Sequence, residues 1–313
     1  MEESRVYDLG YQRYAGPREG RSRARKALFT NGVRLILGIG RGGRSKILPG
    51  LLFLGAIVPA LIFVIVLSVA EPAASSLPGP ADYYQITTVI LILFGAISAP
   101  ELLCSDRRDN VIHLYLVRPL TTNDYLIGRF LAFFVIVLAL VYSGQIILQA
   151  GLILSSPTPL QYIQDNWEVV PKFLLAGLIV AIFITSWPLA ITTFTTRRVY
   201  VASAVIGIYL ITTSIADGLT SLKDCPDTTS QDNPCVAEYV TGDYAKWYSL
   251  LSIRDVPIRI NNMIFEVEQT AGEGPPAAIA GEELHGSIHI IIYLLMISGP
   301  ILLLWLKYRN IRA

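Results

Sequence analysis

The sequence predicts an all-α polytopic membrane protein. We expect six transmembrane helices, a short cytoplasmic helix between spans 2 and 3, and a large outer loop between spans 5 and 6. Charged residues make up only 16% of the 313 residues, against about a quarter in an average soluble protein, and the mean hydropathy is +0.52. The apolar residues gather into six long runs, and lysine and arginine are concentrated on one side of those runs.

The six apolar runs together predict a transmembrane domain over residues 47–306. Each run has about 18 to 25 residues, which is enough to cross a hydrocarbon core of about 30 Å at about 1.5 Å per residue. Pro59 lies inside the first run and predicts a kink there. The predicted spans are residues 47–70, 86–103, 130–154, 173–194, 199–216 and 288–306.

The first 46 residues are polar and rich in arginine, which predicts a basic cytoplasmic tail. Residues 27–37 alternate apolar residues with Asn31 and Arg34, so we expect a helix that lies in the membrane interface before the first span. We expect no signal peptide, because the first apolar run is too long for one. The glycines of the following stretch GIGRGGRSK fit a dinucleotide-binding pattern, but the βαβ context of such a loop is missing, and a basic hinge fits better.

The charged stretch 104–129 separates the second and third apolar runs and is therefore a loop on one membrane face. Val111, Leu114 and Tyr115 recur at helical spacing in it. This spacing predicts a short amphipathic helix near the membrane surface. Pro119 should end that helix, because proline has no backbone N–H and clashes with the preceding turn.

The distribution of basic residues predicts the orientation. Six spans place the N-terminal tail, the 104–129 loop, the 195–198 turn and the C-terminus (307–313) on one side, and all four are basic. That side carries 20 of the Lys and Arg residues against 5 on the other, whereas Asp and Glu divide as 8 against 16. The positive-inside rule therefore predicts a plasma-membrane protein with both termini in the cytoplasm.

The outer loop, residues 217–286, contains Cys225 and Cys235 in the turn-rich stretch CPDTTSQDNPC. On an extracytoplasmic face, this spacing predicts a disulfide, while a metal site would want a Cys-x-x-Cys spacing or a nearby histidine. Residues 244–253 are aromatic and apolar but too short to span. We expect them to lie in the outer interface or to pack on the bundle as a re-entrant segment.

No pattern in the sequence predicts catalysis or a metal site. His285 and His289 would share one helical face, with Glu282 and Glu283 just before them, but two histidines without a certain third ligand do not make a site. The chain also lacks a metalloprotease or hydrolase motif. We therefore expect a protein that is not an enzyme and that carries no metal.

Three polar residues in or beside the predicted spans are candidates for a role within the membrane. Gln145 and Gln149 are four residues apart on the third span, so their face should point into the protein, either joining helices or lining a possible translocation path. Glu101 stands near the cytoplasmic end of the second span, where its carboxylate can reach outward to the interface.

The central loop contains Asp106-Arg107-Arg108, then Arg118-Pro119-Leu120 after a leucine-rich stretch, and then Gly128-Arg129 at the start of the next span. In this order of residues it resembles the loop of the permease subunits of type-2 ATP-binding-cassette exporters. The family has a charged cytoplasmic helix, a leucine-rich stretch that ends in Arg-Pro-Leu, and a Gly-Lys or Gly-Arg start to the next span. The family has Glu and Gly-Thr where this chain has Asp106 and Asp109-Asn110. The layout agrees over nearly the whole chain, and the motif covers about 25 residues. The matching stretches here are DRRDN (106–110), LYLVRPL (114–120) and YLIGR (125–129).

This resemblance implies a transmembrane permease subunit of an exporter that moves a lipid-like or amphiphilic substrate outward. It implies a separate cytoplasmic ATPase subunit and a second permease copy or homologue. No Walker motif is present, so this chain holds no cofactor, and ATP and Mg would bind in the partner. Membrane lipids are expected partners, and nucleic acid is not. The residues implied to couple to the ATPase are Asp106, Arg107, Arg108, Asn110, His113, Tyr115, Arg118 and Pro119.

Other classes of function remain open at this point. An ion-coupled carrier or channel would want charged residues at mid-membrane, which the apolar runs lack. A membrane scaffold or sensor would use the central loop to hold a cytoplasmic partner. Association with an ATPase separates the exporter from both of these alternatives.

Overall fold

The computed structural model describes residues 20–40, 44–69, 79–116, 120–221, 239–267 and 275–309, and every regular element within them is helical. Six of these helices are long and apolar enough to cross a membrane. The all-helical class and the six apolar helices predicted from the sequence are therefore confirmed. The six are α2 (Arg44–Val69), α3 (Pro80–Arg108), α5 (Thr122–Ser155), α7 (Val169–Ile191), α8 (Arg198–Leu219) and α12 (Gly286–Arg309).

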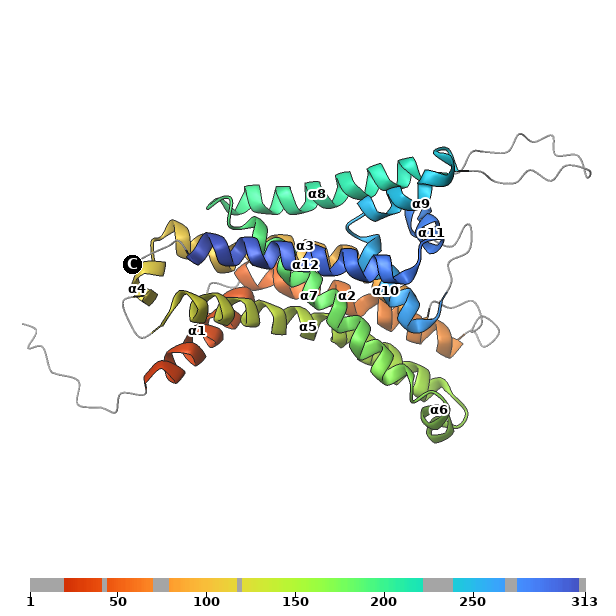
Figure 1. Ribbon diagram of the computed structural model, residues 1–313. Helices are drawn as coiled ribbons and strands as arrows, with labels where there is room; N and C mark the ends of the chain where they lie inside the picture. Colours follow the sequence, from red (N-terminus) through yellow and green to blue (C-terminus); the bar gives the residue numbers. More distant parts are fainter. Residues whose placement is uncertain are drawn as a thin grey trace, which may run out of the picture.

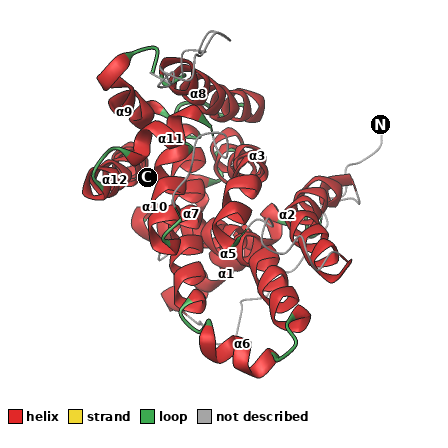
Figure 2. Cartoon of the chain, turned by 90° about the vertical axis from the view of Figure 1, so that its right-hand side faces the viewer, coloured by secondary structure: helices red, strands yellow, loops and turns green. Residues whose placement is uncertain are grey.

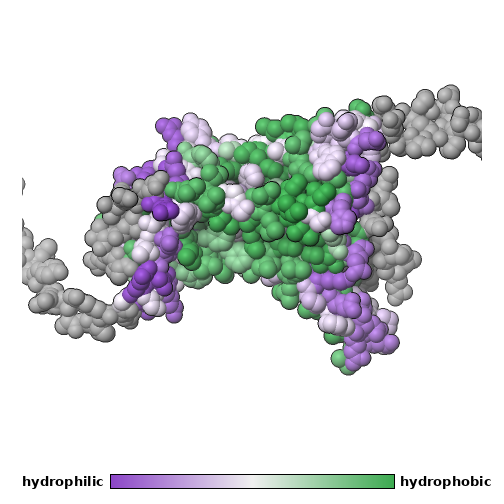
Figure 3. Space-filling view, viewed as in Figure 1, coloured by the Kyte–Doolittle hydropathy of each residue, from purple (hydrophilic) through white to green (hydrophobic). Residues whose placement is uncertain are grey.

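The molecule has an apolar belt between two hydrophilic ends (Figure 3). At one end lie α1 (Gly20–Ile36), the five-residue α4 (Ile112–Leu116) and the end of α12 (Figure 1). At the other end lie α6 (Pro159–Asp165) and α9 (Ala245–Tyr248), with α10 (Asp255–Phe265) and α11 (Pro276–Glu282). We call these the α4 end and the α10 end. Three segments predicted to share one side therefore lie together.

Three of the six long helices form the centre of the bundle. Half to two-thirds of the apolar stretch is buried in α3, α5 and α7, against 17–22% in α2, α8 and α12. Figure 2 views the bundle from the α10 end, with α8 and α2 at its margins. The outer helices thus carry most of the surface that a bilayer would cover.

Glycine permits a close approach of three helices near the middle of α5. A Cβ atom on Gly144 would come within 1.7 Å of the Tyr83 hydroxyl and 2.9 Å of the Ala56 carbonyl oxygen. That hydroxyl donates a 2.8 Å hydrogen bond to the same carbonyl, which joins α3 to α2. Small residues at helix contacts are typical of membrane proteins, where close backbone packing replaces the hydrophobic effect.

The N-terminal helix packs on the bundle more closely than predicted. We expected a helix over residues 27–37 in the membrane interface, but α1 begins at Gly20 and buries Leu28, Gly32 and Ile36. A Cβ atom on Gly32 would lie 2.7 Å from that of Ala132 on α5. The helix therefore belongs to the folded bundle, because its apolar stripe meets a matching stripe of protein rather than lipid alone.

The ends of α3 and α5 differ most from the predicted spans. α3 continues to Arg108, beyond the predicted end at residue 103, and α5 begins at Thr122 rather than at residue 130. The sequence predicted that these two spans stop where the charged stretch 104–129 begins and ends, because an isolated charge is costly in hydrocarbon. In the fold, charges at these two ends pair with one another, and the helices extend through them.

Candidate functional site

The charged stretch at the α4 end is built differently from the single amphipathic helix predicted. Asp106, Arg107 and Arg108 belong to the end of α3, and only residues 112–116 form the short helix α4. Asn110 separates the two helices, with a left-handed φ of 53°. Asparagine tolerates this conformation better than most residues do, so it can end one helix and redirect the chain.

Asp106 holds α3 against α5. Its carboxylate accepts hydrogen bonds from the Arg129 guanidinium at 2.5 Å and from the Tyr125 hydroxyl at 2.7 Å. Both members of the ion pair are nearly enclosed, with 9% of the Asp106 side chain and 1% of the Arg129 side chain exposed. Asp106 was expected on an exposed docking helix. It lies inside the bundle instead, because a buried charge needs a partner and Arg129 provides one.

Aromatic rings surround the buried arginine. The guanidinium of Arg129 lies 5.8 Å from the ring centroid of Tyr115 on α4 and 5.6 Å from that of Tyr125. The two rings pack on each other, and Tyr308 of α12 stacks on the far side of Tyr125. Cation–π attraction offsets part of the cost of burying Arg129 and attaches α4 to the bundle through Tyr115. Tyr115, a predicted coupling residue, therefore faces the protein.

A second face of α3 holds the turn between α7 and α8, residues 192–197. Arg107 donates hydrogen bonds of 2.9 and 2.8 Å to the carbonyl oxygens of Thr192 and Thr193. These carbonyls lie at the C-terminal end of α7, where a cation is favoured by the helix dipole. Arg107 therefore caps α7, a role that the sequence alone did not predict.

Two further contacts lie on this same face of α3. The thiol of Cys104 donates to the carbonyl oxygen of Thr195 at 3.4 Å. Glu101 forms an ion pair with Arg198, the first residue of α8. Glu101 was expected to reach outward from the membrane, but it pairs with a neighbouring helix instead. We call the residues Glu101, Cys104, Asp106, Arg107, Tyr125 and Arg129 the end cluster.

α5 begins directly after the loop that carries α4. The Asp124 carboxylate accepts from the Thr121 backbone N–H, and the Thr121 hydroxyl accepts from that of Asp124, which makes a capping box. Arg21 and Arg25 of α1 both form ion pairs with the same carboxylate, at 2.6 and 2.7 Å. One acidic residue thus caps α5 and holds α1.

The remaining predicted coupling residues divide into two groups. Arg108 and Asn110 are exposed, together with Asp109, and Leu114 on α4 is 70% exposed. These side chains form the outward surface of the α4 end. The backbone of His113 lies in α4, but its side chain is not among the described ones, and Arg118 and Pro119 lie outside the described residues.

Two glutamines on α5, Gln145 and Gln149, carry buried amide groups. Gln145 is fully enclosed, yet neither its amide nitrogen nor its carbonyl oxygen has a hydrogen-bond partner within the described part of the chain. The amide nitrogen of Gln149 is also buried without one. Both roles given to these residues, joining helices and lining a path, stay predictions.

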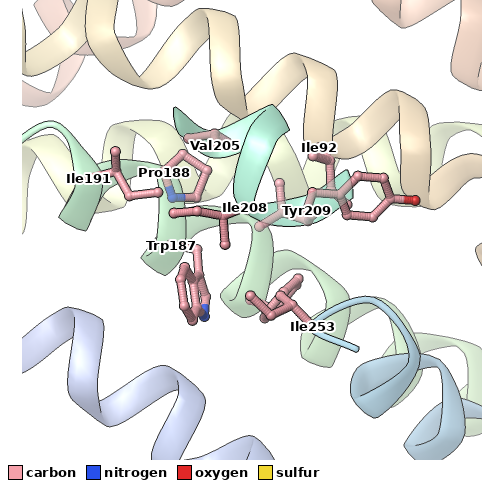
Figure 4. Close-up of a pocket in the computed structure, with 10 residues that line it drawn as sticks. Ile92, Trp187, Pro188, Ile191, Val205, Ile208, Tyr209 and Ile253 are labelled. Carbon is pink, nitrogen blue, oxygen red and sulfur yellow. The ribbon is translucent and has the colours of Figure 1, made fainter. Parts of the chain in front are cut away.

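An apolar cavity lies between α3, α7 and α8 (Figure 4). Ile92, Trp187, Tyr209 and Ile253 are among the residues that line it, and its volume is about 30 Å³. A cavity of about 150 Å³ is needed to hold a benzene-sized molecule. This cavity is therefore too small to hold a substrate.

The α10 end contains a second group of buried charges that the sequence analysis missed. Arg254 donates to Asp255 at 2.7 Å, and Arg259 of α10 donates to Glu282 of α11 at 2.6 Å. Burial lowers the pKa of Arg254, but the neighbouring Asp255 carboxylate outweighs this effect, and the net shift of the pKa is upward. The pair of Arg259 and Glu282 joins α10 to α11, whereas Arg254 and Asp255 pair at the start of α10. In the sequence, the adjacent Arg254 and Asp255 were the only signal, because Glu282 lies 23 positions after Arg259.

The histidines do not form a metal site in the described residues. His289 is 2% exposed, whereas His285 is exposed and its ring contacts Ser287 at 2.6 Å. Within the described segments, no three His, Cys, Asp or Glu side chains are grouped to hold a metal ion. Cys225 and Cys235 lie outside the described residues, so their disulfide stays a prediction, while Cys104 is a buried free thiol.

Comparison with known proteins adds no family assignment. A scan against protein-family models gives no match for this chain, and a search of curated proteins gives none either. The functional conclusion therefore depends on the geometry of the site and on the chemistry of its residues.

Proposed function

We propose that this chain is the transmembrane permease subunit of an ATP-driven exporter of the ATP-binding-cassette class. In this proposal a separate ATPase subunit binds the α4 end, and two permease chains form the transport unit. The substrate class is lipid-like or amphiphilic and moves outward. ATP and Mg bind in the ATPase, since this chain carries no Walker motif.

One observation carries the proposal: at the α4 end, side chains on two faces of α3 form hydrogen bonds to two different helices, α5 and α7. Asp106 connects this end of α3 to α5, and Arg107 connects it to the end of α7. Both residues directly precede the exposed segment 108–110. A force applied to that segment would move the end of α3 together with α5 and the turn between α7 and α8, because buried ion pairs and close packing transmit displacement between rigid helices.

The exposed residues of the same end are suited to contact a protein partner. Arg108, Asp109 and Asn110 offer charge and hydrogen bonds, and Leu114 offers an apolar anchor that is 70% exposed. The proposed coupling residues thus have two roles. Arg108 and Asn110 touch the ATPase, while Asp106, Arg107 and Tyr115 pass its movement into the bundle.

The distribution of charge disfavours an ion-coupled carrier. Among the described residues, the Asp, Glu, Lys and Arg side chains of the six long helices lie toward the helix ends, and the enclosed Asp106 is neutralised by Arg129. A proton or ion relay wants carboxylates near mid-membrane. The uncharged Gln145 is the enclosed polar side chain nearest the middle of α5.

The test is purification of the tagged chain from its native membrane, with measurement of ATP hydrolysis and of bound P-loop protein. We expect wild-type protein to retain an ATPase, and Arg108→Glu and Leu114→Asp to lose it while reaching the membrane in normal amounts. An interfacial charge reversal can cost several kcal/mol. Arg197→Glu is the matched control, because Arg197 is an exposed arginine at the same end but outside this segment. Wild-type protein that retains no ATPase would exclude the exporter.

A further inference from the structure

An apolar groove runs between α5 and α12 near the α4 end. Four residues of α5 and three of α12 line it, and its volume is about 240 Å³. The groove exceeds the volume of about 150 Å³ that holds a benzene-sized molecule. Its lining residues are Leu126, Ile127, Phe130, Leu131, Ile301, Leu304 and Trp305.

The position of the groove indicates which kind of molecule fills it. It opens on the outer surface of two helices, where Ile127 is 57% exposed and Leu131 is 44% exposed. These residues stand one to three turns from the ends of helices that are long enough to span, so the groove lies within the apolar belt. Apolar side chains offer no hydrogen bonds to water, whereas an acyl chain buries apolar surface against them.

The end of the groove nearest the membrane surface is cationic. The guanidinium of Arg309 lies 4.9 Å above the ring of Trp305, one turn along α12. The indole N–H of Trp305 donates to the side-chain amide oxygen Oδ1 of Asn123 at 3.3 Å, so the ring that closes the groove is held in place. Lys307 stands in the same last turn, and within the described chain neither cation forms an ion pair.

We propose that this groove binds a phospholipid with an anionic headgroup. One acyl chain lies along Phe130 and Ile301, and the headgroup phosphate meets Arg309 above Trp305. Tryptophan at this depth has an apolar body and a polar N–H, which suits the boundary between chain and headgroup. Charge complementarity selects an anionic lipid over a neutral one, because the inner surface of a membrane attracts basic residues next to a span.

The rival occupant is α2, α8 or α12 of a second copy of this chain, since these helices expose much apolar surface. The apolar face of such a helix carries no anion that could pair with Arg309. A phospholipid offers an acyl chain to the apolar lining and an anionic phosphate to Arg309. We therefore assign the groove to a phospholipid.

Native mass spectrometry of the full-length chain tests the assignment, because one spectrum reports bound lipid and copy number together. Protein in detergent micelles is mixed with equal amounts of phosphatidylglycerol and phosphatidylcholine. We expect wild-type protein to retain phosphatidylglycerol preferentially. Arg309→Gln should reduce that preference by about fivefold, which corresponds to about 1 kcal/mol for one basic residue near a headgroup. Ile301→Trp should fill the groove and reduce retention of both lipids.

Two control variants stand at comparable positions outside the groove. Arg197 lies 5.7 Å above the ring of Tyr200 at the same end, so Arg197→Gln removes an equivalent cation–π pair. Leu294→Trp adds the same bulk to an exposed position of α12. Both should retain lipid as wild type does. Equal retention of the two lipids by wild-type protein would overturn the proposal, as would loss of copy number without loss of lipid in the groove variants.

Discussion

Arg129 donates a 2.5 Å hydrogen bond to Asp106 across 23 positions of sequence, and both side chains are almost entirely enclosed. Both residues lie within the predicted loop 104–129, and each is instead a buried part of a helix. The pair joins the two helices on either side of the exposed segment at the α4 end. It therefore sets how that segment is attached to the bundle.

Removing one member of this pair should destabilise the fold strongly. Asp106→Asn leaves the Arg129 charge buried without a counterion, and breaking a buried pair costs about 3–5 kcal/mol. The double variant Asp106→Leu with Arg129→Met removes both charges and should recover most of this loss. Thermal unfolding of the purified protein in detergent measures the difference. Equal loss in the single and double variants would show that the two side chains act independently.

The glycine at the crossing of three helices should not tolerate even one added carbon. Gly144→Ala places a methyl group within 1.7 Å of the Tyr83 hydroxyl, and overpacking of this kind costs about 1–3 kcal/mol. Gly207→Ala on α8 is the matched control, because nothing lies within 4 Å of its added Cβ. We expect a lower unfolding temperature for the first variant and an unchanged or slightly higher one for the second. The opposite order would contradict the packing described.

Asp124 should control the attachment of α1. Asp124→Ala removes one half of the capping box of α5, whose N-cap residue is Thr121, and the shared partner of Arg21 and Arg25. Loss of the capping hydrogen bond alone costs about 1 kcal/mol. Amide hydrogen exchange over residues 20–36 should then become faster, while exchange in the middle of α7 stays as in wild type. Arg34→Ala changes an exposed arginine of α1 and should leave the exchange rates unchanged. No change in Asp124→Ala would assign the attachment to the apolar face instead.

The two hydrophilic ends should label from opposite sides of the membrane. With a membrane-impermeant thiol reagent, Asn110→Cys should react only from the cytoplasmic side and Asp243→Cys only from the outer side. This follows from the excess of basic residues at the α4 end. The parent protein should stay unlabelled without reductant, because Cys104 is buried and Cys225 and Cys235 are expected to be bonded. Reaction of Asn110→Cys from outside would reverse the orientation.

The sequence by itself determined the class of the fold and the number of long apolar helices. Both are local properties, since about 20 consecutive apolar residues cross a bilayer whatever their neighbours are. The same local signal predicted a charged loop over residues 104–129, and the exposed residues 108–110 lie within it. It misplaced the ends of α3 and α5, because a charge beside an apolar run is costly only while it lacks a partner.

Only the tertiary structure decided which polar residues face inward. Asp106 and Arg108 are both charged and only two positions apart, yet one is enclosed by α5 and the other is exposed. Arg107 caps α7 through two carbonyl groups some 85 positions away, and α1 lies on α5 through an acid about 100 positions away. Such pairings join residues that are distant in the chain. The free energy of burying each charge depends on the partner that the folded bundle brings to it, and composition and spacing do not contain that information.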